Sequence, residues 1–366
     1  MYVIAHNGSR VLGGGETGTA LLLAGLADRG HRVLMLCRDA GMAARVADFA
    51  GIPTGVQRVG GDAALPDALR LAARLRRERP DAVILTTFKK VLLAGTAARM
   101  ARVPFVVQRI VLEGDTPRAA RYRFALRRFV DAITLNAEAM RPAFLAGDPS
   151  LDPRKVVTLL DGVGAPRAER EPGAVRRELG IPADAVVVGA VARLASQKRF
   201  DRLLRAASSL SSPVHVLIAG EGGRRAQLES LAAELGMADR VHLPGFRTDV
   251  GDVLAALDVF AVTSQSEGMA NAMLEAMAAG VPVVSTDVSG AREALDAAPG
   301  ETPPGLVCGF EVDEIAAALA HVLADDGRRA MGEAARARAE ARFGRARFLD
   351  EWERLLMDGL RRGRGT

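Results

Sequence analysis

Short apolar runs alternate with longer amphipathic stretches along the whole chain. A short apolar run bounded by turn residues predicts a buried strand, and an apolar repeat near 3.6 residues predicts a helix. The runs form two series, one in each half of the sequence. The strands predicted for the first half lie near Val3 and at Val33–Cys37, Ala82–Thr86, Phe105–Gln108, Ala132–Leu135 and Val156–Leu160. Those of the second half lie at Ala185–Ala192, Val214–Ala219, Arg240–Leu243, Val259–Thr263 and Val281–Ser285.

Strands that alternate with helices predict a parallel sheet with helices on both faces, the doubly wound α/β arrangement. Because the pattern runs twice, we expect two Rossmann-like domains, residues 1–165 and 166–344, that face each other across a cleft. The stretch Asp161–Gly173, with its glycines, prolines and charges, is the expected linker. An amphipathic helix within residues 345–366 is expected to return to the first domain.

Composition narrows the class of protein. With 366 residues, 49% of them hydrophobic, the chain has room for two domains with cores of their own. Its two cysteines, Cys37 and Cys308, are far apart and indicate no disulfide framework, which fits a reducing compartment. No signal-like apolar segment precedes His6, and no later run is long enough to span a membrane. We therefore expect a cytoplasmic protein.

The net charge of +5 favours anionic partners, which include nucleic acid, lipid head groups and phosphorylated metabolites. Nucleic acid is the least favoured of these, because the sequence has neither zinc-ligand spacing nor an aromatic-rich basic motif.

The segment Ser264–Gly280 joins a predicted strand to a predicted helix. From Ala270 to Ala279 this helix is apolar on nearly every side, which is typical of a buried helix, yet it carries Glu275. A buried carboxylate is costly unless something hydrogen-bonds it. A ribose diol could donate both hydroxyls to Glu275 while the helix N-terminus binds a phosphate. The alternative is an ion pair between Glu275 and an arginine of a neighbouring helix.

Two cations, Arg193 and Lys198, lie in one loop after a predicted strand. They could neutralise a departing diphosphate in the transition state, as a divalent metal does in other transferases. The alternative is an ordinary solvated loop. On the first interpretation we expect neither a metal nor a cofactor.

The two glutamates Glu267 and Glu275, followed by Ala-Met-Ala-Ala-Gly-Val-Pro-Val-Val, resemble the nucleotide-sugar motif of the retaining group 1 (family 4) glycosyltransferases, which have the GT-B fold. The resemblance implies transfer of a sugar from a nucleotide-diphosphate donor with retention of anomeric configuration. It assigns Glu267 to the donor sugar, Glu275 to the ribose, and Arg193 and Lys198 to the diphosphate. The residues that begin the helix are expected to contact the donor as well: Gly268, Met269, Ala270 and Asn271.

Three glycine-containing loops extend this interpretation. Gly222 follows one predicted strand, and Phe246 and Arg247 follow another. The resemblance implies that backbone groups near Phe246 read the nucleobase, although the residues alone favour ordinary strand-to-helix turns for both loops. Gly14 and Gly15 lie in a third loop, Gly13–Gly18, which also spells the spaced glycines of a dinucleotide site. Because several residues separate it from the first predicted strand, we prefer the place that the resemblance implies, beneath the donor phosphates or the acceptor.

The chain departs from the family pattern on the acceptor side. Many members have a histidine after the strand that corresponds to Phe105–Gln108, where this chain has Arg109. Asp161 stands where an Asn-Gly-Val turn is usual. We therefore assign no catalytic base. In a retaining transfer the departing phosphate oxygen can take the acceptor proton, so catalysis would rest on positioning and charge stabilisation.

A basic amphipathic helix is predicted over Arg118–Val130, with Tyr122, Phe124 and Phe129 on its apolar side. Such a helix could lie on anionic lipid at the inner face of a membrane, or it could pack on the core with a solvated arginine face. The acceptor would be a sugar, a lipid-linked molecule or a small molecule, and we expect a role in cell-envelope glycan, glycolipid or lipopolysaccharide synthesis.

Other functions stay open at this point. A nucleotide-sugar epimerase or phosphorylase could use the same fold, and a non-catalytic sensor of sugar nucleotides could keep the same binding residues. An NAD(P) dehydrogenase is less favoured, because it would leave Arg193, Lys198, Glu267 and Glu275 without a common purpose.

Overall fold

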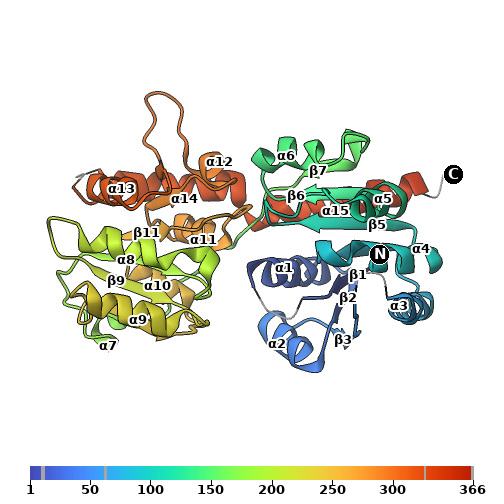
Figure 1. Cartoon of the computed structure of the whole chain (residues 1–366), viewed down its shortest axis with the longest axis horizontal. Coiled ribbons are helices and arrows are strands. Elements are labelled where there is room, and N and C mark those ends of the chain that lie inside the picture. The colour runs from blue at the N-terminus through green and yellow to red at the C-terminus, as the bar shows by residue number, and fades with distance from the viewer. Residues whose placement is uncertain (10–12, 62–63, 325–326, 364–366) are drawn as a thin grey trace. The chain divides into compact units, whose positions relative to one another are not determined.

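The computed structural model describes residues 1–9, 13–61, 64–324 and 327–363. The chain divides into two compact units (Figure 1). Unit 1 comprises Met1–Asp161 together with Ala346–Thr366, and unit 2 comprises Gly162–Arg345. The first boundary lies at the start of the expected linker, and no helix or strand occurs between Val163 and Gly173.

Unit 1 is built on a seven-stranded sheet in which all pairs are parallel. Its order is β3-β2-β1-β4-β5-β6-β7. The strands are β1 Tyr2–Asn7, β2 Arg32–Cys37, β3 Thr54–Val56, β4 Ala82–Leu85, β5 Phe105–Ile110, β6 Ala132–Leu135 and β7 Val156–Thr158. The helices are α1 Gly14–Asp28, α2 Ala40–Ala50, α3 Leu65–Glu78, α4 Val91–Met100, α5 Ala120–Phe129 and α6 Arg141–Ala146, with short 3-10 turns η1 Phe88–Lys90, η2 Glu138–Met140 and η3 Pro153–Lys155.

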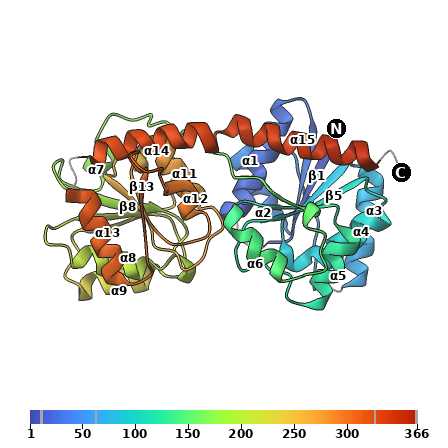
Figure 2. The same ribbon diagram turned by 90° about the horizontal axis from the view of Figure 1, so that it is seen from above.

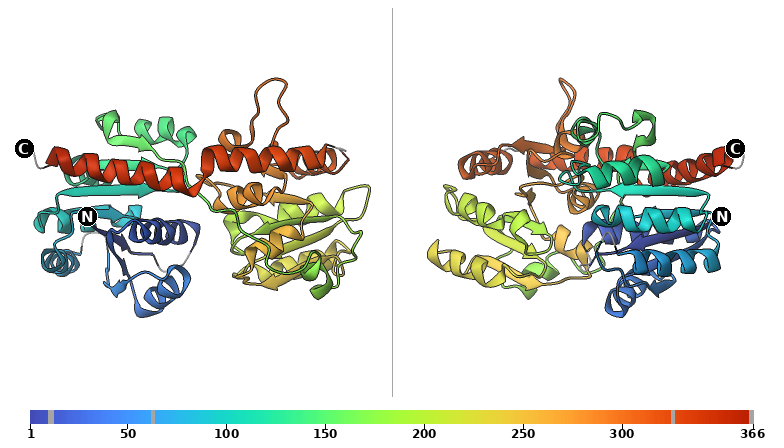
Figure 3. Two further views of the ribbon diagram at one scale, coloured as in Figure 1. Left: turned by 180° about the vertical axis from the view of Figure 1, so that it is seen from behind. Right: turned by 45° about the vertical axis from the view of Figure 1, so that its right-hand side comes forward.

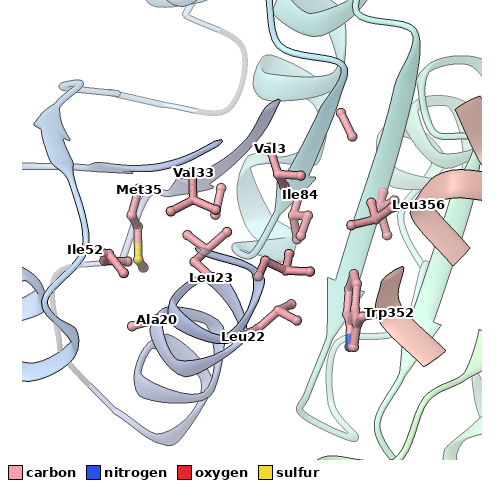
Figure 4. Close-up of a cluster of buried hydrophobic side chains, with 14 of the residues drawn as sticks. Val3, Ala20, Leu22, Leu23, Val33, Met35, Ile52, Ile84, Trp352 and Leu356 are labelled. Atoms are coloured by element: carbon pink, nitrogen blue, oxygen red, sulfur yellow. The ribbon is translucent and has the colours of Figure 1, made fainter. Parts of the chain in front are cut away.

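The core of unit 1 lies between one face of this sheet and α1, α2 and the last helix, α15 (Arg345–Gly363). Figure 4 shows Trp352 and Leu356 of α15 beside Ile84 of the sheet and Leu22 of α1. Glycines permit the close approach: a Cβ on Gly25 of α1 would lie 2.5 Å from the Leu349 side chain. The predicted return of the C-terminal helix to the first domain is confirmed (Figure 3).

Unit 2 is built on a six-stranded parallel sheet of order β10-β9-β8-β11-β12-β13. The strands are β8 Val187–Val191, β9 His215–Ala219, β10 Val241–Gly245, β11 Val259–Val262, β12 Val283–Thr286 and β13 Gly305–Cys308. The helices are α7 Ala174–Glu178, α8 Phe200–Ser208, α9 Arg225–Glu234, α10 Val250–Ala255, α11 Asn271–Ala279, α12 Ala291–Leu295, α13 Val312–Ala324 and α14 Arg328–Phe343, with the turn η4 Ser196–Lys198. Residues of α8, α9 and α13 form the core on one face of the sheet (Figure 2).

Strand β3 was not predicted, and neither was β13 as a member of the sheet. Strand β3 has only three residues, none of them buried, so it leaves no apolar run. Strand β13 begins with Gly305, where a Cβ would lie 2.1 Å from the carbonyl oxygen of Val283 on β12. Strand β1 extends to Asn7, beyond the apolar run near Val3 from which it was predicted. His6 and Asn7 are buried in the strand, but their polar side chains end the apolar run in the sequence.

If the strands are numbered from the start of each unit, both sheets have the order 3-2-1-4-5-6, and the sheet of unit 1 continues with a seventh strand. This order confirms two Rossmann-like doubly wound domains. In each, the chain order reverses between the first and the fourth strand of that sheet: β1 and β4 in unit 1, β8 and β11 in unit 2. Ligands of open parallel sheets bind at the carboxyl ends of the strands beside this switch point. Among the described residues, no helix combines the length and apolar composition that a membrane span requires.

Candidate functional site

The loops that follow β8 and β11 are joined at the switch point of unit 2. The amide of Gln265 donates to the carbonyl oxygen of Gln197 at 2.8 Å, and the Thr263 hydroxyl donates to the carbonyl oxygen of Lys198 at 3.0 Å. The Lys198 ammonium lies 2.6 Å from a carboxylate oxygen of Glu267. Residues that are about 70 positions apart in sequence are therefore held as one site.

The pairing of Lys198 with Glu267 gives each residue a defined position. The side chain of Glu267 is only 9% exposed and that of Lys198 is 25% exposed. A lysine ammonium has three donors, so Lys198 can bind an anion while it keeps one hydrogen bond to Glu267. Glu267 is thus the counter-ion of Lys198.

Arg193 lies on the exposed side of the same loop and makes no ion pair within the described part of the chain. Its loop is held from behind by Gly222, where a Cβ would lie 2.3 Å from the carbonyl oxygen of Leu194. The amide of Leu194 donates to the Glu221 carbonyl at 2.9 Å, and the amide of Arg224 donates to the Leu194 carbonyl at 3.1 Å. Gly222 therefore fits a close backbone contact, and it positions the loop that carries Arg193.

Helix α11 starts beside these cations. Its N-cap residue, Ala270, offers no side-chain acceptor, and Met269 and Ala270 are buried. The preceding backbone is held by the Gly290 amide, which donates to the Gly268 carbonyl at 2.7 Å. The amino end of a helix carries a partial positive charge, so the start of α11 favours an anion.

Glu275, one turn further along α11, has an unusual environment. Burial raises the pKa of its carboxyl from 4.5 to about 7. No hydrogen bond or ion pair involves its side chain in the residues that the structure describes. The alternative of a Glu275–arginine pair is therefore wrong for this chain. Arg336 of the adjacent helix α14 donates to the Ala279 carbonyl at 2.9 Å instead.

The loop after β10 presents backbone rather than charge. Phe246 is 74% exposed. The guanidinium of Arg247 pairs with Asp249 at 2.6 Å and with Glu178 of α7. Hydrogen bonds from Arg247 and Arg170 lower the pKa of Glu178 to about 2. The guanidinium of Arg247 is thus paired with two carboxylates, and Phe246 beside it is the exposed residue of this loop.

Gly14 and Gly15 lie in unit 1, whereas the other predicted site residues lie in unit 2. They open α1, and the Glu16 carboxylate accepts from the Gly13 amide at 3.0 Å. A Cβ on Gly14 would meet no atom within 4 Å, and one on Gly15 would lie 2.9 Å from Val111. Residues 10–12 of the loop that precedes α1 are outside the described residues.

Sequence reasoning missed that Arg109 and Asp161 contact each other. Their side chains lie 2.6 Å apart and are 3% and 6% exposed. The only signal was that both positions depart from the family pattern. No three His, Cys, Asp or Glu side chains of the described ranges are grouped so that they could hold a metal.

Comparison with protein families agrees with this geometry. Residues 173–338 match the model of the glycosyl transferases group 1, and residues 13–162 match that of the glycosyl transferase 4-like domain. The second half of the chain therefore carries a group 1 glycosyltransferase domain, and the first half a glycosyl transferase 4-like domain. The predicted family and fold are therefore confirmed.

Curated relatives match over parts of their length. The lipopolysaccharide core biosynthesis glycosyltransferase LpsE of Rhizobium meliloti is 40% identical over 115 residues, which cover 31% of this chain and 34% of LpsE. The 2-deoxystreptamine glucosyltransferase of Streptomyces kanamyceticus is 31% identical over 237 residues, 62% of this chain and 58% of that protein. The chain thus spans about a third to somewhat over half of the length of these relatives.

Solved structures share the fold over nearly the whole chain. HepE of Anabaena, crystallised with UDP and glucose, superposes with a TM-score of 0.84 at 22% identity and covers 98% of this chain and 100% of that chain. A sucrose-phosphate synthase of Thermosynechococcus elongatus gives a TM-score of 0.79 at 19% identity, with 98% of each chain covered.

Proposed function

We propose that this protein is a retaining glycosyltransferase whose unit 2 binds a nucleotide-diphosphate sugar. The observation that carries the proposal is the arrangement at the switch point of unit 2. There the Lys198–Glu267 pair lies in loops that also carry Arg193 and lead into α11, which bears the unpaired Glu275. An anion site and an unpaired carboxylate one helical turn apart match a diphosphate and a ribose.

The ribose would bind at Glu275. Its two hydroxyls can donate to both carboxylate oxygens, which offsets the cost of holding an ionised carboxylate in this buried position. A ligand with a hydrogen-bond donor pair therefore gains more here than a purely apolar ligand.

The diphosphate would bind Arg193, Lys198 and the first amides of α11. In the transfer the bond between the sugar C1 and the phosphate oxygen breaks, and a bond between C1 and the acceptor oxygen forms. The negative charge that develops on the diphosphate is stabilised by the two cations and the helix N-terminus. The departing phosphate oxygen takes the acceptor proton on the same face of the sugar, so configuration is retained without an enzyme base.

For the donor nucleotide, UDP is the first candidate, because HepE was crystallised with UDP and with UDP-glucose. For the acceptor, a lipopolysaccharide core sugar is the first candidate, because LpsE and LpsD of Rhizobium meliloti are lipopolysaccharide core biosynthesis glycosyltransferases.

Helix α5 supports contact with an anionic membrane. Arg121, Phe124 and Arg128 are exposed on it, and Phe124 is 53% exposed. Tyr122 packs against Phe88 with ring centroids 4.8 Å apart, and Phe129 packs edge-to-face against Phe124 at 5.4 Å. Of the three aromatic residues of the predicted apolar side, Phe124 is the exposed one and would enter a bilayer. Sedimentation with phosphatidylglycerol vesicles at low and high salt tests this contact. Binding that is absent at low salt, or unchanged in Phe124→Ser with Arg128→Ser, would refute it.

The test of the transferase proposal is calorimetry with UDP, GDP, ADP and NAD without added metal, followed by incubation of the matching sugar nucleotides with glycan acceptors. We expect one nucleoside diphosphate to bind, Glu275→Ala to weaken it, and a product whose anomeric configuration, read by proton NMR, equals that of the donor. Binding of NAD alone would favour a dehydrogenase. Binding without any transfer, epimerisation or phosphorolysis would favour a sensor.

A further inference from the structure

A buried ion pair occupies the carboxyl end of β5 in unit 1. One guanidinium nitrogen of Arg109 lies 2.6 Å from Asp161, and the other donates to the Gly15 carbonyl and to the Thr19 hydroxyl, each at 2.9 Å. The second carboxylate oxygen of Asp161 accepts from the Asn136 amide at 2.8 Å. This cluster is named the Arg109 network below.

The Arg109 network joins two functional points of unit 1. Gly15 lies in the first turn of α1, at the end of the loop after β1 and therefore beside the switch point of the sheet. Asp161 is the last residue of unit 1 before the chain passes to unit 2. Arg347 of α15 also donates to the carbonyl oxygen of Leu160 at 2.7 Å, so the backbone at this exit is held from a second side.

Stability alone does not explain the network. Ion pairs in a protein interior are often replaceable by apolar residues without loss of stability, because two charges must be desolvated. Two polar atoms beside the pair, Asn136 Oδ1 and Thr134 Oγ1, are buried and accept or donate no hydrogen bond in the described residues. The pair does supply a rigid bridge, since the two terminal nitrogens of one planar guanidinium bond Asp161 and the Gly15 carbonyl at the same time.

We propose that Arg109 and Asp161 are positioning residues that hold the first turn of α1 at a fixed place relative to the point where the chain leaves unit 1, and that this sets the rate of sugar transfer. The effect on the rate of transfer rests on the proposed function. The structural link between the first turn of α1 and Asp161 does not.

Arg109→Lys is the informative variant, because a single ammonium keeps the charge beside Asp161 but cannot reach Gly15 and Asp161 together. The matched control is Arg99→Lys. Arg99 also pairs with an aspartate, Asp131, but at the amino end of β6 and without a contact to α1.

Hydrogen exchange tests the link directly. In Arg109→Lys we expect the amides from Thr17 to Thr19, the first that are hydrogen-bonded within α1, to exchange about tenfold faster or more, while those of β5 and α15 keep their protection. Arg99→Lys should leave the first turn of α1 unchanged. Exchange within about twofold of wild type in Arg109→Lys would overturn the proposal.

Kinetics test the consequence. We expect Arg109→Lys and Asp161→Asn to lower kcat about tenfold or more, with an unchanged dissociation constant for the nucleoside diphosphate, because its proposed contacts with Arg193, Lys198 and Glu275 lie in unit 2. A wild-type kcat in both variants would overturn the rate effect. If the wild type transfers no sugar and yet α1 loosens in Arg109→Lys, the proposed function fails and the structural link stands.

Discussion

The carboxyl of Glu275, which has no partner among the described residues, leads to opposite predictions for stability and for ligand binding when it is replaced. Its pKa is raised by burial from 4.5 to about 7, so the folded protein binds this proton more tightly than the unfolded chain. A group with a raised folded pKa stabilises the fold below its unfolded pKa, and this contribution is lost as pH rises through the folded pKa. Between about pH 4.5 and 7 the wild type should therefore lose stability that a neutral side chain would keep.

Glu275→Gln removes the charge and keeps the size. A shift of about 2.5 pKa units corresponds to about 3 kcal/mol, and because the side chain keeps some contact with water we expect about 2 kcal/mol. The variant should match the wild type near pH 4.5 and become more stable by this amount above pH 7. The buried His6 titrates in both proteins and cancels in the difference.

The assay is urea unfolding of wild type and Glu275→Gln from about pH 4.5 to 8.5, with linear extrapolation to water. Glu340→Gln, at an exposed position of α14, is the control and should show no pH-dependent difference. The same variant should bind the nucleoside diphosphate about tenfold more weakly or worse, because an amide accepts fewer hydrogen bonds from a ribose diol. A pH-independent difference, or a less stable variant at pH 8, would refute the reasoning.

Further outcomes follow from single contacts. Lys198→Gln should lower kcat about 100-fold by steady-state kinetics and cost about 1–3 kcal/mol in urea unfolding, since Glu267 loses its partner. Gly222→Ala should cost about 1–3 kcal/mol by thermal unfolding and weaken diphosphate binding in calorimetry, since a Cβ would collide with the Leu194 carbonyl. Trp352→Ala should cost about 3–5 kcal/mol in urea unfolding, since its ring is buried in the core of unit 1. Burial lowers the pKa of His6 from 6.5 to about 4, so the wild type should lose about 3 kcal/mol as pH falls through this window, and His6→Gln should not, as parallel urea titrations would show.

The strands that sequence reasoning located are those with continuous apolar runs. Strand β4, with Ala82–Leu85 all buried, is typical. Strand β3 escaped because none of its three residues is buried and they leave no apolar run. Strand β13 escaped because it opens on Gly305 directly after Pro303 and Pro304, residues that usually mark a turn. The buried His6 and Asn7 hid the end of β1 for a different reason, since a polar residue ends an apolar run even where the strand continues.

The candidate site could be predicted as far as its residues follow strands, because the carboxyl ends of parallel strands share one edge. That rule brings Lys198 and Glu267 to the same edge, but it cannot say that they form an ion pair. The ion pair of Arg247 with Glu178 likewise depends on how α7 packs against α10, which no spacing in the sequence records.

Glu267 and Glu275 differ in their partners: Glu267 forms an ion pair with Lys198, and the pKa of Glu275 is raised by burial alone. Glu267 is paired with the ammonium of Lys198, which stabilises the loop, and the other two donors of this ammonium can bind a second anion. Glu275 has no such partner among the described residues, and burial raises its pKa to about 7 because an ionised carboxylate is costly there. A side chain retained mainly for stability would have been paired or replaced, because a neutral residue of the same size is favoured there above pH 7. The cost is recovered only when donors reach the carboxylate, which makes Glu275, rather than the paired Glu267, the residue whose environment most strongly indicates a bound ligand.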